Sequence, residues 1–350
     1  MAKTCELFIG IDLHKAYSQV AVIDSLGKVI EERRLSNNLE TITGFFSGLK
    51  GRAKGVVEAS GSWYWFVDHL KSIGFDIFLA HPLKVKMIAS AKIKTDRIDA
   101  KILGNLLRAD LIPMSYIASE EEIEQRSLLR FRFSLMQQKT KLKNSIHSIL
   151  TKYNIAFNGS DLFSVRGIEF LKTLNNLPEY QKHFIGQYLE LIEDLGKRIK
   201  NIDEKIKKEV GEDEDTKLLT TIPGVGNFTA LLLKAEIGDI TRFPSDHHLC
   251  SYFGLVPSVH QSGKTSYSGK ITKQGDSSVR WALGQAALAA VRREGYLKEC
   301  YEDISNRSGK PKAKVAVARK ILSSAYFVLT RKQPYYKPSK KELLSDPKRS

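Results

Sequence analysis

The first hundred residues carry hydrophobic positions at the spacing of strands, and then of strands alternating with helices. Strands are expected at 7–13, 18–24 and 29–35, around Val56 and Val57, and at 75–80. Helices are expected at 39–49, at 64–72 and from Thr95 through Leu107. Short turns join the first three strands into a meander, whereas helices separate the later ones. This order predicts a ribonuclease-H-like α/β domain over residues 1–118.

Residues 119–215 have the pattern of long, charged helices. Apolar residues recur every seven positions, at Leu128, Leu135, Leu142 and Ile149. A second stripe, spaced by three and four, runs from Phe184 to Val210. Such stripes predict a helical, coiled-coil region. The helices that carry these stripes could pack on each other as an antiparallel hairpin or on the helices of a second subunit. The pattern favours neither arrangement.

Residues 216–332 are predicted to be a mainly α-helical domain that opens with a glycine turn. The run Ile222-Pro223-Gly224-Val225-Gly226 precedes a helical pattern from Thr229 to Ile237. A turn of this kind can present backbone amides at Gly224 and Gly226 to a phosphate. An ordinary turn between two helices would have the same pattern. The basic tail over 333–350 contains three prolines and is expected to be disordered.

The net charge of the chain indicates which class of molecule it binds. Lys and Arg number 55 against 39 Asp and Glu, a net charge of +16, which favours a polyanion such as nucleic acid or a membrane surface. No apolar stretch reaches the roughly 18 residues of a membrane span, and the N-terminus lacks the apolar segment of a signal peptide. Nucleic acid is therefore the expected partner. The three widely spaced cysteines are expected to be buried thiols in a reducing cytoplasm.

Four acidic residues form the strongest candidate site. Asp12 interrupts a strand that is apolar on both faces, and Glu58 closes the strand at Val56 and Val57. Asp96 and Asp99 lie three apart at the start of a helix and so share one face. Carboxylates placed in this way predict a divalent-cation site of the kind that phosphoryl-transfer enzymes need.

Any one of these carboxylates could instead be structural, although Asp12 is the hardest to explain in that way because its neighbours predict burial. Asp96, for example, would suit a helix N-terminus through the helix dipole, and Glu58 could be a surface residue after a strand. His14 and Lys15 follow Asp12 closely. A lone histidine or lysine at a strand end is usually not a ligand, so neither is assigned to the site.

A second candidate for chemistry lies between Phe253 and a helix expected to begin near Ser278. The segment is rich in glycine, hydroxyl and basic residues and follows an apolar, strand-like run. Such a loop can bring amides, lysines and a nucleophilic hydroxyl to a phosphodiester. Ser262 is the candidate nucleophile, and the alternative is a flexible basic loop that holds a phosphate backbone. Candidates for phosphate contacts are Lys264, Lys270, Lys273 and Arg280.

Taken in order, these motifs resemble those of the DEDD-type insertion-sequence transposases. The matching segments are Gly10-Ile11-Asp12-Leu13-His14-Lys15, Val57-Glu58-Ala59-Ser60-Gly61, Lys94-Thr95-Asp96-Arg97-Ile98-Asp99-Ala100, Ile222-Pro223-Gly224-Val225-Gly226, Gly254-Leu255-Val256-Pro257 with Ser262-Gly263, and Ile271-Thr272-Lys273-Gln274-Gly275. The resemblance covers nearly the whole chain. Members of this family are understood as bridge-RNA-guided serine recombinases, and pilin-inverting DNA invertases are among their relatives.

The resemblance implies a particular set of site residues. An N-terminal domain similar to Holliday-junction resolvases (RuvC-like) would bind Mg²⁺ or Mn²⁺ through its four carboxylates, Asp12, Glu58, Asp96 and Asp99. A coiled-coil region and a C-terminal transposase domain would follow, and the serine nucleophile of that domain falls on Ser262. Many relatives carry two adjacent serines there, whereas this chain has Gln261-Ser262. Ser258 and Ser266 lie nearby in the sequence.

The predicted function is that of a cytoplasmic DNA transposase or recombinase. The family implies that it acts on donor and target double-stranded DNA, is guided by a structured RNA and works as a homo-oligomer, either a dimer or a tetramer. Two alternatives remain. A metal-dependent endonuclease on branched DNA would use the carboxylates with water as nucleophile. A non-catalytic nucleic-acid-binding protein would need only the basic surface.

Overall fold

The structure, a computed structural model, describes residues 7–50, 52–59, 61, 63–89, 95–262, 265–293 and 295–336. It divides into two compact units, Met1–Ile117 and Ala118–Ser350. Most of the tail that was expected to be disordered, 337–350, lies outside the described residues. Within them, no helix is both long enough and apolar enough to cross a membrane.

The first unit is built on a five-stranded mixed sheet. Its strands are β1 (Leu7–Leu13), β2 (Tyr17–Asp24), β3 (Val29–Ser36), β4 (Ala53–Glu58) and β5 (Asp76–Ala80). Their order is β3-β2-β1-β4-β5. The first three strands are antiparallel, and β4 and β5 add in parallel on the other side of β1. The predicted strands are confirmed, and the mixed α/β sheet fits the ribonuclease-H-like class.

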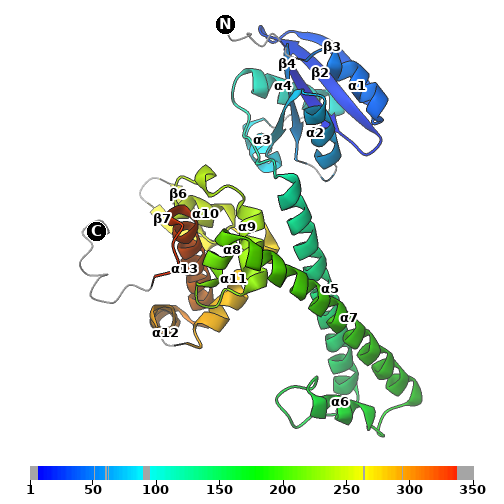
Figure 1. Ribbon diagram of the computed structural model, residues 1–350, viewed down its shortest axis with the longest axis vertical. Coiled ribbons are helices and arrows are strands. Elements are labelled where there is room, and N and C mark those ends of the chain that lie inside the picture. Colours follow the sequence, from blue (N-terminus) through cyan, green and yellow to red (C-terminus); the bar gives the residue numbers. More distant parts are fainter. Residues whose placement is uncertain are drawn as a thin grey trace, which may run out of the picture. The chain divides into compact units, whose positions relative to one another are not determined.

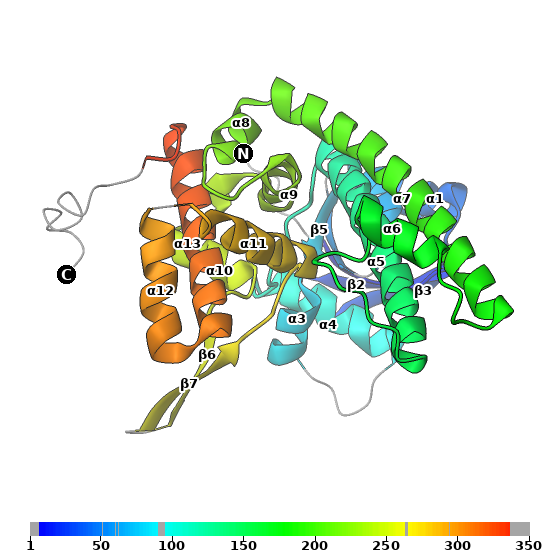
Figure 2. The ribbon, with the colours of Figure 1, turned by 90° about the horizontal axis from the view of Figure 1, so that it is seen from below.

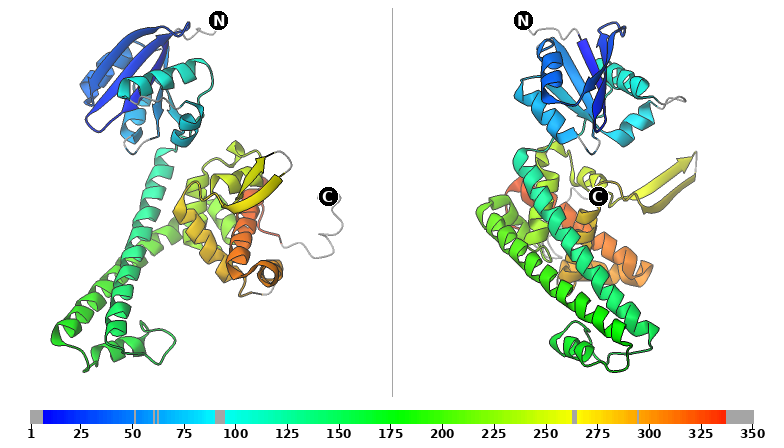
Figure 3. Two further views of the ribbon diagram at one scale, coloured as in Figure 1. Left: turned by 180° about the vertical axis from the view of Figure 1, so that it is seen from behind. Right: turned by 90° about the vertical axis from the view of Figure 1, so that its right-hand side faces the viewer.

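Helices cover both faces of this sheet. They are α1 (Leu39–Ser47), α2 (Trp63–Ser72), α3 (Pro82–Ile88) and α4 (Asp96–Arg108). Ile9 and Ile11 of β1 belong to the hydrophobic cluster of Phe46 and Phe66, from α1 and α2. A separate cluster places α4 on the opposite face, as Figure 3 shows. Because β1 is central and covered on both sides, its apolar run is buried as predicted.

Glycine lets α4 lie unusually close to β1. A Cβ atom on Gly10 would lie 1.8 Å from the carbonyl oxygen of Ala100 and 2.4 Å from the backbone nitrogen of Gly104, both in α4. A Cβ on Gly104 would in turn meet the backbone nitrogen of Gly10 at 3.1 Å. The strand and the helix therefore touch backbone to backbone, and this contact sets the height of α4 above the sheet.

The second unit begins with a helical hairpin. Its helices are α5 (Glu120–Lys152), the short α6 (Val165–Lys172) and α7 (Glu179–Glu212). Ser119 caps α5 in a capping box with Glu122. Arg132 of α5 pairs with Asp203 of α7, while further along α5 Ile146 packs in one cluster with Ile185 of α7. The two helices therefore run antiparallel and pack on each other within one chain (Figure 1). This is the antiparallel hairpin, the first of the two arrangements that the sequence left open.

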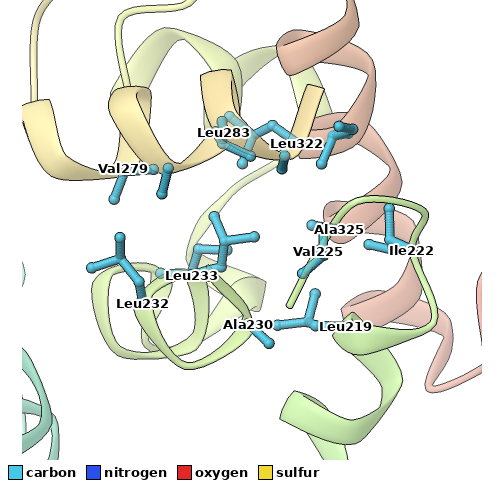
Figure 4. Close-up of a cluster of buried hydrophobic side chains, with 14 of the residues drawn as sticks. Leu219, Ile222, Val225, Ala230, Leu232, Leu233, Val279, Leu283, Leu322 and Ala325 are labelled. Carbon is cyan, nitrogen blue, oxygen red and sulfur yellow. The ribbon is translucent and has the colours of Figure 1, made fainter. Parts of the chain in front are cut away.

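The rest of the second unit is mainly helical, as predicted. Its helices are α8 (Glu214–Thr220), α9 (Asn227–Ile237), the 3₁₀ turn η1 (Ile240–Arg242), α10 (Asp246–Tyr252), α11 (Ser277–Ala290), α12 (Tyr296–Ser308) and α13 (Lys310–Arg331). Figure 4 shows the core where α8, α9, α11 and α13 meet, with Leu233, Leu283 and Leu322 fully buried. Cys250 is buried, but Cys300 is only half-buried, so the expectation of buried thiols is wrong for Cys300, and Cys5 lies outside the described residues.

One segment of this unit differs from expectation. The stretch expected to be a basic loop forms two antiparallel strands, β6 (Pro257–Ser262) and β7 (Thr265–Ile271). Figure 2 shows this hairpin extending away from the helices. The apolar run before it, expected to be strand-like, is helix α10 with buried Leu249 and Cys250. A short apolar run does not distinguish a buried helix from a buried strand.

Candidate functional site

The carboxyl ends of β1 and β4 are adjacent and carry Asp12 and Glu58. The residues just before these two are paired across the parallel strands. Because side chains alternate along a strand, Asp12 shares a face with Gly10 and Glu58 shares one with Val56. Gly10 touches α4, and Val56 packs in the hydrophobic cluster between the sheet and α4. Both carboxylates therefore belong to the α4 side of the sheet.

The N-terminus of α4 carries the other two acidic residues. Thr95 is the N-cap, and its hydroxyl oxygen accepts a hydrogen bond from the backbone nitrogen of Ile98. Asp96 and Asp99 lie in the first turn, where the positive end of the helix dipole stabilises negative charge. The same helix that packs on β1 therefore brings its acidic end to the carboxylate face of the sheet.

A histidine joins two of these carboxylates. The Nε2 atom of His14 lies 3.1 Å from Oδ2 of Asp12 and 3.2 Å from Oδ2 of Asp96. The Tyr17 hydroxyl donates a hydrogen bond of 2.9 Å to the same oxygen of Asp96. The ligand atoms of Asp12, His14 and Asp96 all lie within 4.8 Å of one another. We call these three residues the Asp-His-Asp cluster.

The electrostatics of the cluster reflect its crowded carboxylates. Burial raises the pKa of Asp12, His14 opposes that shift, and the nearby negative charges of Asp96 and Asp99 raise it further. The pKa of Asp96 is lowered, chiefly by the hydrogen bond from Tyr17. Carboxylate and imidazole groups gathered around a partly buried acid form a donor set that suits a divalent cation, whose charge would offset the repulsion.

The predicted carboxylates are brought together in part. Asp12 and Asp96 are in the Asp-His-Asp cluster, and Asp99 is close enough to shift the pKa of Asp12. Among the described residues, Glu58 and Asp99 are not in the group within 4.8 Å. His14, which was not assigned to the site from the sequence, lies between two of the carboxylates. Its position two residues after Asp12, just beyond the end of β1, was the available signal.

The candidate nucleophile lies at the end of β6. Ser262 is the last residue of that strand, and its backbone pairs with Thr265 of β7. Gly263 and Lys264 lie outside the described residues. Ser258 is on the same strand, and its Oγ would lie 2.4 Å from a Cβ on Gly269. The strand confirms that this segment is extended.

The predicted phosphate contacts have different environments. Lys270 and Lys273 are exposed, as a phosphate-binding lysine must be. Arg280 instead donates through Nη1 to the carbonyl oxygens of Phe253, Gln274, Gly275 and Asp276. These contacts give Arg280 a structural role in holding the loop that leads into α11.

The glycine turn precedes a helix, as predicted. Gly224 has φ of +84°, and a Cβ there would lie 2.1 Å from the carbonyl oxygen of Ala286, so only glycine fits. Gly226 is the N-cap of α9 and supplies no side-chain cap. A cavity of about 410 Å³ in front of it is lined by Lys200 and Lys207, together with two acidic residues. The turn thus has the packing role of an ordinary helix connection, and Gly226 lines a cavity in which two lysines are matched by two acidic residues.

A mixed sheet with acidic residues at the ends of its central strands and on the facing helix fits the class of phosphoryl-transfer enzymes with a ribonuclease-H-like domain. Two family models match the chain. The DEDD transposase model of the IS110 type covers residues 9–155, and the model described as "Transposase IS116/IS110/IS902 family" covers residues 216–302. The chain belongs to the DEDD-type insertion-sequence transposases, and it is an enzyme of the DNA transposase and recombinase type.

Individual relatives are similar along most of their length. The transposase for insertion sequence element IS1111A of Coxiella burnetii is 28% identical, with 93% of this chain and 90% of the relative covered. The transposase for insertion sequence element IS1328 of Yersinia enterocolitica is 26% identical, with 92% and 96% covered. The pilin gene-inverting protein of Moraxella bovis is 25% identical, with 81% of each chain covered.

Proposed function

We propose that the protein is the recombinase of its own insertion sequence and that it cuts and rejoins DNA with a bound divalent cation and a serine nucleophile. The observation that carries the proposal is the convergence of Asp12 and Asp96 on one face of the sheet, with Asp99 close by. Mg²⁺ or Mn²⁺ held there would polarise the scissile phosphate. Family membership supports the reaction class.

The chain's own residues have distinct roles in this proposal. Asp12 and Asp96 hold the cation, with Asp99 and Glu58 on the same side of the sheet. Tyr17 fixes the orientation of the Asp96 carboxylate through its hydrogen bond. Exposed lysines such as Lys270 and Lys273 would hold the DNA backbone without reading its sequence.

The covalent step would involve Ser262. Its hydroxyl loses a proton, its oxygen forms a bond to phosphorus, and the bond from phosphorus to one sugar oxygen breaks. That sugar oxygen leaves as a free hydroxyl, and the phosphoserine link keeps the phosphodiester energy for rejoining. The carboxylates and Ser262 belong to different compact units of the chain.

Sequence specificity is proposed to come from a structured guide RNA encoded beside the gene. The net charge of +16 supports the binding of long polyanions, both RNA and DNA. Exchange between two duplexes needs more than one active site, so we propose a homo-oligomer, a dimer or a tetramer. The test is whether purified protein selects one DNA site only when the RNA is present. Equal selection without RNA would refute the guide.

A trapped intermediate tests the nucleophile. A DNA substrate with a nick beside the cleavage point should leave DNA attached to the protein after denaturation, and peptide mapping should place the link at Ser262. Ser262→Ala should abolish the adduct, whereas Ser258→Ala should retain it. An adduct at another serine would move the nucleophile without changing the mechanism.

An endonuclease that uses water is the second candidate. It is favoured by the position of the Asp-His-Asp cluster, which lies entirely within the first unit and needs no serine for hydrolysis. Such an enzyme would cut branched DNA in the presence of Mg²⁺ and leave free ends. Cleavage without any adduct on the nicked substrate, and undiminished in Ser262→Ala, would establish this function in place of recombination.

A further inference from the structure

The distances around His14 match those between neighbouring ligands of a metal ion. Its Nε2 atom lies 3.1 Å from one carboxylate oxygen and 3.2 Å from the other. In an octahedral cation site with bonds of about 2.1 Å, adjacent ligand atoms lie about 3.0 Å apart. The imidazole nitrogen therefore lies from each of the two carboxylate oxygens at nearly the spacing of neighbouring ligands on one cation, and the two oxygens lie within 4.8 Å of each other.

The backbone of His14 is held on both sides. Its amide nitrogen donates to the carbonyl oxygen of Tyr17 at 2.9 Å, which closes the turn from β1 to β2. Its carbonyl oxygen accepts a hydrogen bond of 2.7 Å from Nδ2 of Asn37. Asn37 is itself fixed, because its Oδ1 accepts a hydrogen bond from the Ser18 hydroxyl at 2.6 Å. The backbone that carries the imidazole is thus fixed by hydrogen bonds.

The ring of His14 is also supported from the side. It lies against the ring of Tyr17, with 4.7 Å between the ring centres. The guanidinium of Arg34 lies 3.5 Å from the centre of the Tyr17 ring, in the manner of a cation–π contact. These contacts restrict the movement of the His14 ring.

We propose that His14 is itself a ligand of the catalytic cation, so that the site uses nitrogen as well as oxygen. The proposal rests on the proposed function, which places a cation at these carboxylates, and adds a ligand that the DEDD pattern does not include. Imidazole is a better ligand for transition metals than for Mg²⁺. The site should therefore hold Mn²⁺ more tightly, relative to Mg²⁺, than carboxylates alone would.

The competing explanation is that His14 is only a counter-ion. A protonated imidazole would then neutralise the two carboxylates in the free protein and would have to leave before a cation could bind. The two explanations predict opposite effects of removing the ring. If His14 is a ligand, its loss weakens cation binding. If it is a counter-ion, its loss leaves cation binding unchanged or makes it tighter.

The test is Mn²⁺ binding to the full-length protein, measured by titration and by electron spin-echo spectroscopy, which detects a directly bound ¹⁴N nucleus. Wild type should show the nitrogen signal. His14→Gln should lose it and bind Mn²⁺ about tenfold more weakly, with a smaller change for Mg²⁺. The control is His69→Gln in α2, whose imidazole hydrogen-bonds to Thr43 and whose helix packs on the opposite face of the sheet. It should behave as wild type.

The outcomes separate this inference from the proposed function. Mn²⁺ bound without a nitrogen signal, or bound equally tightly by His14→Gln, overturns the role of His14 and leaves the carboxylate site standing. A nitrogen signal that persists in His14→Gln assigns it to another residue and also overturns the inference. If wild type binds no Mn²⁺, or Asp12→Asn binds it as well as wild type does, the carboxylate site of the proposed function fails.

Discussion

Replacing Gly10 by alanine tests whether the contact between β1 and α4 builds the site. The added methyl group would lie 1.8 Å from the Ala100 oxygen and 2.4 Å from the Gly104 nitrogen. Both are backbone atoms, so no side-chain rotation relieves the overlap. Non-bonded contacts are optimal near 3.5 Å, so α4 must move away from β1 by roughly 1.5 Å.

The move has two measurable consequences. Overpacking a core typically costs about 1–3 kcal/mol of unfolding free energy, and a double overlap with backbone should reach about 3 kcal/mol or more. The displaced helix also carries Asp96 away from Asp12. Misplacement of reacting groups by about 1 Å can reduce a rate about 100-fold, so strand cleavage should fall by at least that factor.

The matched control is Gly44→Ala on the exposed face of α1. A Cβ at Gly44 meets nothing within 4 Å, and alanine should stabilise that helix by about 0.5–1 kcal/mol. Denaturant unfolding can be followed through the fluorescence of Trp63 and Trp65, both in α2, together with Mn²⁺ binding and cleavage. If Gly10→Ala unfolds like wild type and binds Mn²⁺ normally, the backbone contact does not position the site.

Three further predictions concern the site, the second unit and the charge. Asp12→Asn or Asp99→Asn should abolish cleavage while leaving the unfolding curve and nucleic-acid binding largely unchanged, and full activity of Asp12→Asn would contradict the metal site. Burial alone would raise the pKa of Asp215, but hydrogen bonds from Lys234 and Lys332 hold that pKa below its ordinary value. The ionised Asp215 therefore stabilises the folded protein above the unfolded-state pKa of about 3.9, and this stabilisation is lost as pH falls through the lower pKa of the folded state. Asp215→Asn should therefore lower stability by about 1–2 kcal/mol at pH 7 and flatten its decline below pH ~4, and equal acid sensitivity in thermal melts of both proteins would exclude this role. Affinity for DNA and RNA, measured by filter binding, should fall steeply with salt because bound lysines and arginines release counterions, and a flat dependence would show that the charge of +16 is not used for binding.

The sheet could be predicted from the sequence because its strands have a clear pattern. Short turns make a meander of β1, β2 and β3, and apolar runs mark β4 and β5. Since Asp12 and Glu58 lie near the ends of two of these apolar runs, their positions at strand ends could be predicted as well. Contacts between distant residues could not be predicted in this way. Tyr17 meets Asp96 across 79 positions of sequence, and no local pattern indicates that pair.

The hairpin of β6 and β7 was missed for a different reason. Its sequence is rich in Gly, Ser and Lys, residues that favour loops or are depleted in strands, so composition favoured a loop. The two strands are nevertheless stabilised by backbone pairing with each other, in which Pro257 is the partner of Ile271 and Ser262 is the partner of Thr265. Arg280 was likewise predicted to contact phosphate because of its charge, whereas its hydrogen bonds to four carbonyl oxygens give it a structural role. A charged side chain in a sequence does not reveal whether its partner is a phosphate or its own backbone.

The cation-free protein must tolerate clustered carboxylates, and its own groups explain how. Asp96 lies at the positive end of α4, and its carboxylate accepts a hydrogen bond from the Tyr17 hydroxyl. These contacts offset the repulsion without a metal. A chelator should therefore stop cleavage but lower the melting temperature by only a few degrees. Melting curves with and without chelator measure this, and unfolding on chelation would show instead that the cation holds the first unit together.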